Sequence, residues 1–381
     1  MNFLFYSTDY KPNTGGISEH TDQIARELYA KGHTVTLIAP SMVGDEDIDT
    51  NRPFTIYRMP NYPLILHLSL LLFPLWLSRK QKIDYIYCPT WFPTGLYSIM
   101  ISKITVAESI IAVHGREVVY SDENLRKKLI QRLNSVQSLI LRSASIVVTV
   151  SSYTKNKLVE IGVPAEKIHI IYNGVKPSDF ETDEIHPVIE REGLSSDNIL
   201  LTVSRLESRK GHDTVIRALP NILKDQPDTT YLIAGTGSEK ESLRELAKEI
   251  GVYDHIFFLG YVPQEDLPKL YNSSDVFVMP ARRDGDSVEG FGIVFLEANA
   301  AEKPVIGGRH GGITDAIQNG ESGLLVEPED EDELAGNVVE LLSNKRKAIS
   351  MGKAGLERCK NKFTWGHVAD RLVGAIHETN Q

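Results

Sequence analysis

The sequence predicts an α/β protein with two domains, each a parallel β-sheet covered by helices on both faces. Short apolar runs, typical of strands buried on both faces, alternate with amphipathic helical patterns along the whole chain. The length of 381 residues exceeds what one hydrophobic core usually supports, so two cores are expected. A polar, acidic segment that contains two prolines, residues 176–187, separates the two series of strands.

Six strands are predicted in each half. Those of the first half are residues 3–7, 34–40, 84–89, 109–114, 145–151 and 167–172, and those of the second are 199–205, 229–235, 255–260, 275–281, 303–308 and 323–326. Such series are typical of doubly wound domains, whose ligands bind outside the carboxyl ends of the strands. We therefore expect a first domain over residues 1–180, a second over 181–363, and an active site between them.

Charge and cysteine content exclude several classes of function. The net charge of −10 gives no overall electrostatic basis for nucleic-acid binding, so no nucleic-acid partner is expected. Cys88 and Cys359 are the two cysteines, too far apart in sequence for metal-binding spacing, which argues against a disulfide framework and structural zinc. The first residues are typical of a strand and lack a secretion signal, so a cytoplasmic location is expected.

One apolar segment, residues 63–77, has two interpretations. It is shorter than the roughly 20 residues of a membrane-spanning helix and is interrupted by His67 and Pro74. It is either a helix buried in the first domain or an interfacial helix, next to Arg79 and Lys80, that contacts a membrane peripherally from the cytoplasmic side.

Two glutamates eight positions apart, Glu289 and Glu297, bracket a predicted strand-to-helix junction. The strand 275–281 runs into a polar loop, and Gly290 and Gly292 then open an apolar helical stretch. The first N–H groups of a helix have no intrahelical partner and bind phosphate. A carboxylate before that end can hold sugar hydroxyls, and one about two turns into the helix can reach a ribose. The ordinary alternative is a helix-capping carboxylate with a solvated partner.

Two features of the first half lie at predicted strand ends. Gly15 and Gly16 come between the first strand and an amphipathic helix, where paired glycines let a backbone approach an anion. The spacing is not the dinucleotide-binding fingerprint, and an ordinary turn is the alternative. His114 ends the strand 109–114, where it can hydrogen-bond a substrate hydroxyl or, alternatively, be satisfied by backbone groups.

In the second half, cations and glycines follow the strands. Arg205 and Lys210 come after the strand 199–205, where two cations can stabilise a departing nucleoside diphosphate without a metal. Arg209, between them, is interpreted as surface charge. Gly235 and Gly237 follow the next strand, and the segment 257–262 ends another; both loops are candidates to hold the base.

Taken in order, these motifs resemble the retaining GT-B glycosyltransferases of the large group 1 family. The similar motifs are G-G-I, H-G-R-E, S-R-L-E-S-R-K-G, G-Y-V-P, D-V-F-V-M-P, E-G-F-G-I-V-F-L-E, G-G-I-T-D and G-E-S-G-L-L-V, which cover nearly the whole chain. Within the family, the sequence looks most like the phosphatidylinositol mannosyltransferase branch. The resemblance implies two Rossmann-like domains facing across a cleft, with the last helix, about residues 364–381, returning to the first, acceptor-side domain.

The resemblance also implies roles for the matching residues. Arg205 and Lys210 match the diphosphate-binding pair of the family, Glu297 its ribose-binding glutamate, and Glu289 the glutamate near the donor sugar. In the first domain, Gly16 matches the glycine that faces the phosphates, and His114 the histidine near the anomeric centre. Further donor contacts are expected at Gly15, Gly235, Gly237, Val262, Phe291 and Gly292.

We therefore expect a retaining hexosyltransferase that needs no metal or other cofactor. The donor would be a GDP- or UDP-linked hexose, with GDP-mannose favoured, and the acceptor lipid-linked or a polysaccharide. Two alternatives stay open. A nucleotide-sugar 2-epimerase of the same fold would use acid–base carboxylates in the first domain, for which Asp9, Glu19 and Glu117 are candidates. A non-catalytic nucleotide-sugar-binding subunit would bind the donor without turnover.

Overall fold

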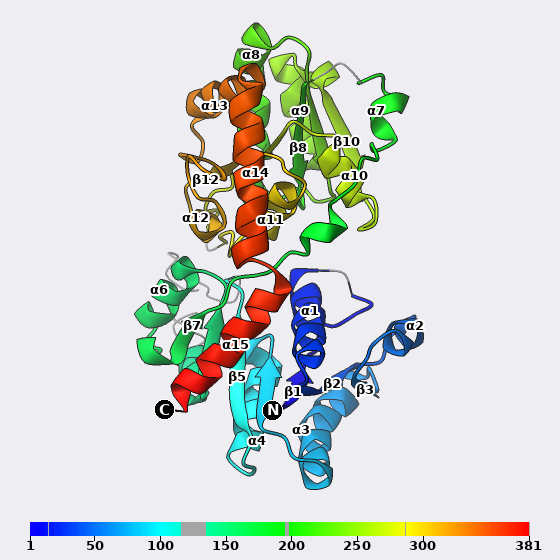
Figure 1. The fold of residues 1–381 in the computed structure, drawn as a ribbon, viewed down its shortest axis with the longest axis vertical. Coiled ribbons are helices and arrows are strands. Elements are labelled where there is room, and N and C mark those ends of the chain that lie inside the picture. Colours follow the sequence, from blue (N-terminus) through cyan, green and yellow to red (C-terminus); the bar gives the residue numbers. More distant parts are fainter. Residues whose placement is uncertain (14, 116–134, 195–197, 286, 381) are drawn as a thin grey trace. The chain divides into compact units, whose positions relative to one another are not determined.

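The structure is a computed structural model that describes residues 1–13, 15–115, 135–194, 198–285 and 287–380 (Figure 1). The chain divides into two compact units. Unit 1 comprises Met1–Asn173 together with Trp365–Gln381, and unit 2 comprises Gly174–Thr364. The chain therefore passes from one unit to the other twice, after Asn173 and after Thr364.

Unit 1 is built on a parallel sheet with the strand order β3-β2-β1-β4-β5-β6-β7 among the described residues. The strands in chain order are β1 (Asn2–Tyr6), β2 (Thr34–Pro40), β3 (Thr55–Met59), β4 (Tyr85–Cys88), β5 (Glu108–Val113), β6 (Ile146–Thr149) and β7 (Ile168–Ile170). The register pairs Phe3 with Val35 of β2 and with Tyr85 of β4. The order reverses between β1 and β4, which makes this pair the topological switch point of the sheet.

The edge strand β3 was not predicted from the sequence. It pairs in parallel with β2, from Thr36 opposite Thr55 to Pro40 opposite Met59. Four of its five residues are at least partly exposed, because an edge strand has a neighbour on one side alone. It therefore lacks the continuous apolar run that identifies the central strands of a parallel sheet.

Helices cover both faces of this sheet. They are α1 (Gly16–Ala30), α2 (Asp45–Thr50), α3 (Pro63–Lys80), α4 (Leu96–Ser102), α6 (Ser152–Glu160) and α15 (Trp365–Thr379). The last of them, α15, contacts α1 and β6, and Figure 1 shows it beside α1. Its side chains Val368, Ala369 and Leu372 are fully buried. The prediction that the C-terminal helix returns to the first domain is confirmed.

Unit 2 has a second parallel sheet, in the order β10-β9-β8-β11-β12-β13 among the described residues. Its strands are β8 (Asn198–Val203), β9 (Thr229–Ala234), β10 (Ile256–Gly260), β11 (Val276–Met279), β12 (Val305–Gly308) and β13 (Gly323–Val326). All six were predicted. The order reverses between β8 and β11, which is the switch point of this sheet.

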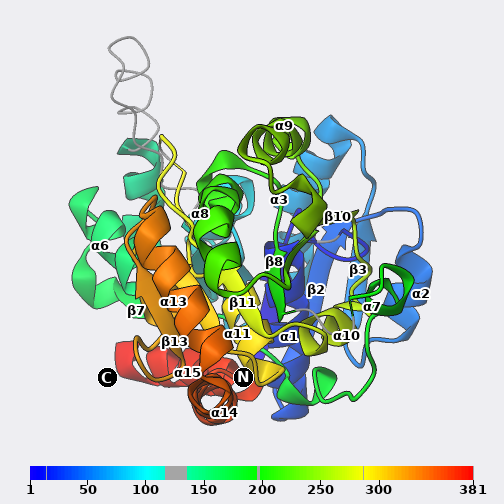
Figure 2. The ribbon, with the colours of Figure 1, turned by 90° about the horizontal axis from the view of Figure 1, so that it is seen from above.

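The helices of unit 2 are α7 (Val188–Arg191), α8 (His212–Asp225), α9 (Lys240–Ile250), α10 (Leu267–Asn272), α11 (Ile293–Ala300), α12 (Ile313–Ala316), α13 (Glu331–Ser343) and α14 (Lys345–Lys362). Figure 2 shows α8 next to α13, and these two helices are in contact. A single cluster of buried residues joins them to the sheet, with Val215 and Leu219 from α8 and Leu334 and Val338 from α13. The expected doubly wound architecture is confirmed in both units.

The polar segment 176–187 belongs to unit 2 rather than forming a linker between units. Phe180 is buried there, with its ring 5.7 Å from the ring of Tyr271. The change of unit comes earlier, at Asn173 and Gly174. A polar composition therefore did not mark the point at which the chain leaves unit 1.

The apolar segment is the helix α3, and it is neither fully buried nor fully exposed. Leu66, Leu70 and Leu77 pack against the sheet, whereas Leu64 and Leu72 are 74% and 59% exposed. Pro74 lies inside the helix and has no N–H for the carbonyl of Leu70, which accepts a hydrogen bond from the Tyr6 hydroxyl instead. Among the described residues, no helix is long and apolar enough to cross a membrane.

Candidate active site

The predicted site residues follow the strands at or beside the two switch points. In unit 2, Arg205 and Lys210 follow β8, and Glu289 follows β11. In unit 1, Gly15 and Gly16 follow β1, and His114 follows β5, the neighbour of β4. Since the carboxyl ends of parallel strands share one edge, each unit collects its own candidates at the edge where doubly wound sheets bind ligands.

A compact cluster of charges in unit 2 centres on Glu289. Its Oε2 atom lies 2.5 Å from Lys210 Nζ and 2.8 Å from Arg209 Nη1. The three side chains are largely buried, at 16%, 11% and 7% exposure respectively. The other carboxylate oxygen, Oε1, takes part in neither contact. Arg209 was interpreted from the sequence as surface charge, and that interpretation is wrong.

The ionisation of Glu289 is set by these two cations. Burial alone would raise the pKa of Glu289, but Lys210 and Arg209 outweigh burial and lower the pKa to about 2. Burial lowers the pKa of Lys210, while its attraction to Glu289 opposes that change. Glu289 is therefore a carboxylate at any physiological pH, able to accept hydrogen bonds but not to donate a proton.

Arg205 is the most exposed cation of this cluster. Its side chain is 52% exposed and pairs with Glu207, which also accepts a hydrogen bond from Arg209 Nε at 2.9 Å. His212 supports the loop from behind, with Nε2 2.9 Å from the Ser204 hydroxyl and Nδ1 3.1 Å from the Tyr231 hydroxyl. Burial lowers the pKa of His212 to about 4, so it is a neutral support.

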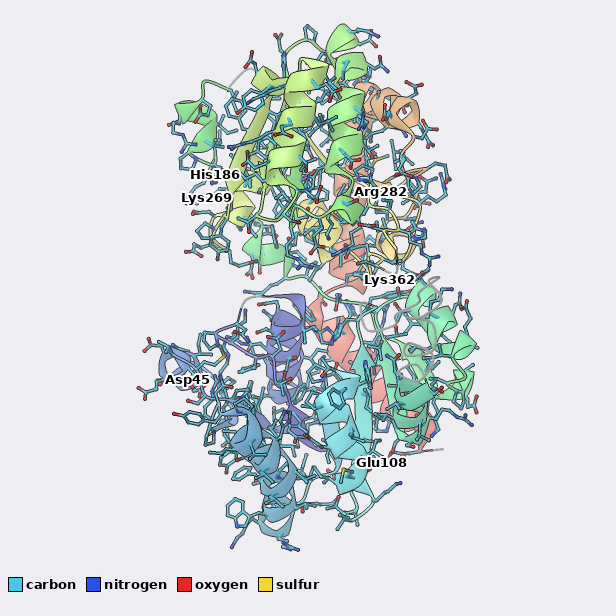
Figure 3. All side chains as sticks on the ribbon, turned by 180° about the vertical axis from the view of Figure 1, so that it is seen from behind. Asp45, Glu108, His186, Lys269, Arg282 and Lys362 are labelled. Atoms are coloured by element: carbon cyan, nitrogen blue, oxygen red, sulfur yellow. The ribbon has the colours of Figure 1, made fainter. Side chains whose placement is uncertain are left out.

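The loop after β11 is tied to the loop after β8. Arg282, labelled in Figure 3, binds Asp213 through Nη1 and Nη2, at 2.9 and 3.0 Å. Its main-chain N–H donates to the carbonyl of Arg209 at 2.9 Å. The paired, two-point geometry fixes the loop that carries Glu289 relative to the two basic residues that contact it.

Glycines in unit 2 allow this close packing. A Cβ atom on Gly211, whose φ is +76°, would lie 2.3 Å from the carbonyl oxygen of Pro280. One on Gly235 or Gly237 would lie 1.8 or 2.2 Å from the carbonyl oxygen of Ser204 or Leu206. Gly235 and Gly237, expected to contact the donor, are thus required by the fold itself because they let the β9 loop pack against the loop that carries Arg205.

The helix α11 starts later than predicted. Gly292 precedes it with φ +85°, and Glu297 is its fifth residue, so Glu297 lies about one turn from the N-terminus rather than two. Its Oε2 atom accepts a hydrogen bond of 2.7 Å from the hydroxyl of Tyr271. Phe291 is 2% exposed and its ring contacts that of Phe363, so any ligand contact would come from its main chain.

Val262 lies at the same edge, after β10. This strand is the outermost of the sheet, and Gly260 at its end accepts a hydrogen bond from the N–H of Gly235 at 2.7 Å. Val262 itself is partly exposed. The predicted donor contacts therefore follow β8, β9, β10 and β11 along one edge of the sheet.

Gly15 and Gly16 in unit 1 have different surroundings from the glycines of unit 2. Both are exposed, and a Cβ atom on either would meet no other atom within 4 Å. Gly16 is the first residue of α1. No neighbour among the described residues therefore requires a glycine at position 16. The space around Gly16 is open to a ligand that approaches the start of α1.

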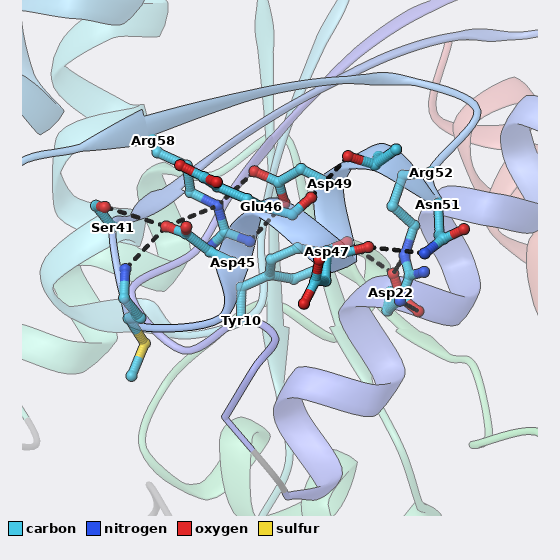
Figure 4. Close-up of polar contacts among 12 residues, drawn as sticks. Tyr10, Asp22, Ser41, Asp45, Glu46, Asp47, Asp49, Asn51, Arg52 and Arg58 are labelled. Carbon is cyan, nitrogen blue, oxygen red and sulfur yellow. Dashed lines mark hydrogen bonds and ion pairs between the residues drawn. The ribbon is translucent and has the colours of Figure 1, made fainter.

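A polar network fixes the loop between β1 and α1 (Figure 4). The Tyr10 hydroxyl donates to Asp22 Oδ1 at 2.6 Å, and Arg52 binds both oxygens of the same carboxylate. Arg58 similarly binds Asp49 through two nitrogens, at 2.6 and 2.9 Å. No sequence pattern indicates this network, because its members come from four separate segments.

His114 is partly buried beside a second histidine that the sequence did not single out. Its ring is 4.7 Å from that of His20 and nearly perpendicular to it, at 86°. Burial lowers the pKa of His114 to about 4, and a hydrogen bond to the backbone at Pro89 opposes this change. Since proline has no N–H, the carbonyl of Pro89 accepts that bond from the imidazole. His114 is therefore neutral at physiological pH.

The carboxylates suggested for an epimerase do not form an acid–base pair among the described residues. Glu19 binds Lys11 and Gln23, at 2.6 and 2.7 Å, and Asp9 accepts a hydrogen bond from Asn13. Glu117 lies outside the described residues.

Burial raises the pKa of Cys88 and of Cys359 to about 12, so both thiols stay protonated at neutral pH.

Comparison with known proteins decides the family. Residues 14–179 match the family model of Glycosyltransferase Family 4, and residues 188–358 match that of Glycosyl transferases group 1. A GDP-mannose-dependent alpha-(1-6)-phosphatidylinositol monomannoside mannosyltransferase of Mycolicibacterium smegmatis is 31% identical, over 97% of each chain. The chain belongs to the group 1 glycosyltransferases. The corresponding Mycobacterium tuberculosis enzyme is 30% identical over 97% of this chain and 96% of its own.

Solved structures show the same fold. Anabaena HepE in complex with UDP superposes with a TM-score of 0.82 at 21% identity, over 99% of this chain and 100% of its own. Sucrose-phosphate synthase from Thermosynechococcus elongatus gives 0.77 at 22% identity, over 99% of each chain. The fold is GT-B, and the family models identify the protein as a glycosyltransferase. These matches give the 2-epimerase alternative no support.

Proposed function

We propose that this glycosyltransferase transfers mannose from GDP-mannose to a lipid-linked acceptor, with retention of anomeric configuration and without a metal. The choice of donor follows the relatives at 30–31% identity, whose names specify GDP-mannose. The observation that carries the mechanism is the cluster of Arg209, Lys210 and Glu289 at the switch point of unit 2.

The cations of unit 2 would bind the diphosphate. A departing nucleoside diphosphate gains negative charge as the glycosidic bond breaks, and fixed cations stabilise that charge. Arg205, which is exposed and pairs with Glu207, would meet the phosphates together with Lys210, while Arg209 holds the carboxylate of Glu289 in place. Gly15 and Gly16 would approach the phosphates from unit 1, and Glu297 would bind the ribose.

Glu289 would position the sugar rather than transfer protons. A carboxylate with a pKa of about 2 cannot act as a general acid at neutral pH, but Oε1 can accept hydrogen bonds from sugar hydroxyls. His114, whose neutral ring is hydrogen-bonded to the backbone at Pro89, would contact the transferred sugar. The acceptor proton would then leave with the departing phosphate oxygen, which is the front-face mechanism implied by the family resemblance.

Metal independence needs a direct test. The chain contains Asp-x-Asp triplets, a pattern that can bind metal–diphosphate, at residues 45–47, 47–49, 284–286 and 330–332. Asp45 and Asp49 pair with Arg58, and Asp286 lies outside the described residues. Among the described residues, no three His, Cys, Asp or Glu side chains gather as metal ligands would.

A lipid-linked acceptor is supported by the outer face of α3. Leu64, Leu68, Leu72 and Trp76 follow one another at four-residue spacing and are 47–74% exposed. We call these four residues the α3 stripe. Lys80 lies over the Trp76 ring at 6.0 Å, and Arg79 precedes it at the end of the helix. Apolar side chains beside exposed cations are typical of helices that lie on an anionic membrane surface.

The proposal is tested by incubating the purified protein with vesicles that contain phosphatidylinositol and with labelled GDP-mannose, UDP-glucose or ADP-glucose. We expect transfer from GDP-mannose, undiminished by EDTA, and an α-linked product by NMR of the anomeric proton. Arg205→Ala should lower turnover about 10²- to 10³-fold, as expected for the loss of one transition-state contact. Transfer from UDP-glucose alone, or loss of activity in EDTA, would overturn the donor or the metal-free mechanism respectively.

A further inference from the structure

A buried histidine, His20, joins several functional segments of unit 1. It lies on α1 and is 1% exposed. Its Nδ1 atom is 2.8 Å from Asn173 Oδ1, and its Nε2 atom is 2.8 Å from the Tyr87 hydroxyl. The residue is therefore held at both ring nitrogens, by a strand residue and by the last residue of unit 1 before the chain leaves it.

These contacts define the protonation of the ring. Burial and the nearby His114 lower the pKa of His20 well below its usual value, so the ring is neutral. The amide oxygen of Asn173 can only accept, so Nδ1 carries the proton, and Nε2 accepts from the Tyr87 hydroxyl. Each nitrogen of the neutral His20 ring, one a donor and the other an acceptor, therefore has a hydrogen-bond partner.

Two other rings pack against His20 at steep angles. His114 lies at 4.7 Å and 86°, and Trp365 at 5.8 Å and 76°. Trp365 is the first residue of unit 1 after the chain returns to it. His20 therefore contacts both points at which the chain leaves and re-enters unit 1, and the histidine that we expect to touch the sugar.

We propose that His20 is a positioning residue, which holds the ring of His114 in the orientation used for sugar transfer. The inference rests on the proposed role of His114. If this position served packing alone, an apolar residue would fill the same space without the free-energy cost of burying an imidazole, so the presence of histidine favours a polar role. The two hydrogen bonds fix the plane of the His20 ring. Because the His114 ring packs nearly perpendicular to that plane, a fixed His20 ring limits the orientations of the His114 ring.

Two substitutions separate positioning from simple packing. His20→Gln supplies an amide that can donate to Asn173 and accept from Tyr87, but has no ring for His114. We expect its melting temperature to stay close to that of the wild type, while kcat for GDP-mannose turnover falls by up to about 100-fold with little change in donor KM. Turnover is measured as transfer to phosphatidylinositol vesicles or as slow donor hydrolysis.

A matched pair of tyrosines provides the control. Tyr87→Phe removes the hydroxyl that holds His20, and Tyr6→Phe removes an equally buried hydroxyl that bonds α3 instead. Both should lower stability by similar amounts, but we expect Tyr87→Phe alone to lower kcat. Equal effects on kcat, or wild-type kcat in His20→Gln, would overturn the proposal.

A measurement without activity keeps this inference separate from the proposed function. In wild-type protein labelled with ¹⁵N-histidine, NMR should show His20 as the Nδ1–H tautomer and His114 as a single neutral tautomer. In His20→Gln, the hydrogen bond to the carbonyl of Pro89 remains but the perpendicular ring contact is lost, so the ring signals of His114 should shift part of the way towards the average of two tautomers. Unchanged His114 signals would refute the positioning role, even if no donor supported turnover.

Discussion

At the scale of single residues, glycine serves two different purposes, and alanine substitution separates them. Gly237→Ala would place a Cβ atom 2.2 Å from the carbonyl oxygen of Leu206, so we expect unit 2 to lose about 1–3 kcal/mol. Gly16→Ala meets no atom within 4 Å and should change stability by less than about 0.5 kcal/mol, yet weaken binding of the donor. Urea unfolding and donor KM measure the two effects. Full activity of Gly16→Ala would contradict an approach of the phosphates to this residue.

The charge cluster at Glu289 makes a prediction about stability. Glu289→Gln leaves the buried Lys210 without a counter-charge and Arg209 with Glu207 alone, and we expect a loss of about 3–5 kcal/mol at pH 7. Glu340→Gln, which breaks an exposed pair with Lys347, should cost at most about 1 kcal/mol. Both are measured by urea unfolding.

The pH dependence of that loss follows from the lowered pKa of Glu289. Its pKa is about 2 in the folded protein and 4.5 ordinarily, so its contribution is present above pH 4.5 and is lost as the pH falls towards 2. The stability difference between wild type and Glu289→Gln should therefore shrink over that range. A difference that stayed constant below pH 4 would show that the carboxylate is not held by the two cations.

At the scale of the element, α3 uses its two faces differently. The double substitution Leu68→Asp and Leu72→Asp places two negative charges in the exposed α3 stripe. The variant should keep the melting temperature of the wild type but no longer co-sediment with anionic vesicles. Leu70→Asp buries a charge at a fully buried position and should cost more than about 3 kcal/mol. If the double variant still bound vesicles as the wild type does, the outer face of α3 would not be the membrane contact.

At the scale of the whole molecule, the two units differ in how many stretches of the chain form them. Unit 2 is one continuous stretch, whereas unit 1 needs α15 from the end of the chain. Ending the chain after Thr364 removes α15 from α1 and β6, and also the ion pair between Asp370 and Lys31. We expect hydrogen exchange to show lost protection in unit 1 and native protection in unit 2. Equal loss in both units would show that they do not fold independently.

From the sequence alone we could predict the fold class, twelve of the thirteen strands in the described part of the chain, and the position of the candidate residues at strand ends. The twelve are those of the two predicted series, and β3 is the thirteenth. This was possible because strands buried on both faces carry continuous apolar runs, and because motifs at their ends keep their order along the chain. The edge strand β3 gave no such signal because half of its surroundings is solvent.

The sequence does not reveal which charges are buried or what each loop residue contacts, because both depend on the folded structure. Arg209 looks like surface charge in sequence, but the fold places Glu289, eighty positions later, against it. His20 looks like one polar residue on an amphipathic helix, and its partners Tyr87, His114 and Asn173 come from three other segments. Local sequence patterns record which face of an element is apolar, whereas the pKa and the orientation of a side chain depend on neighbours that the sequence brings together only through the complete fold.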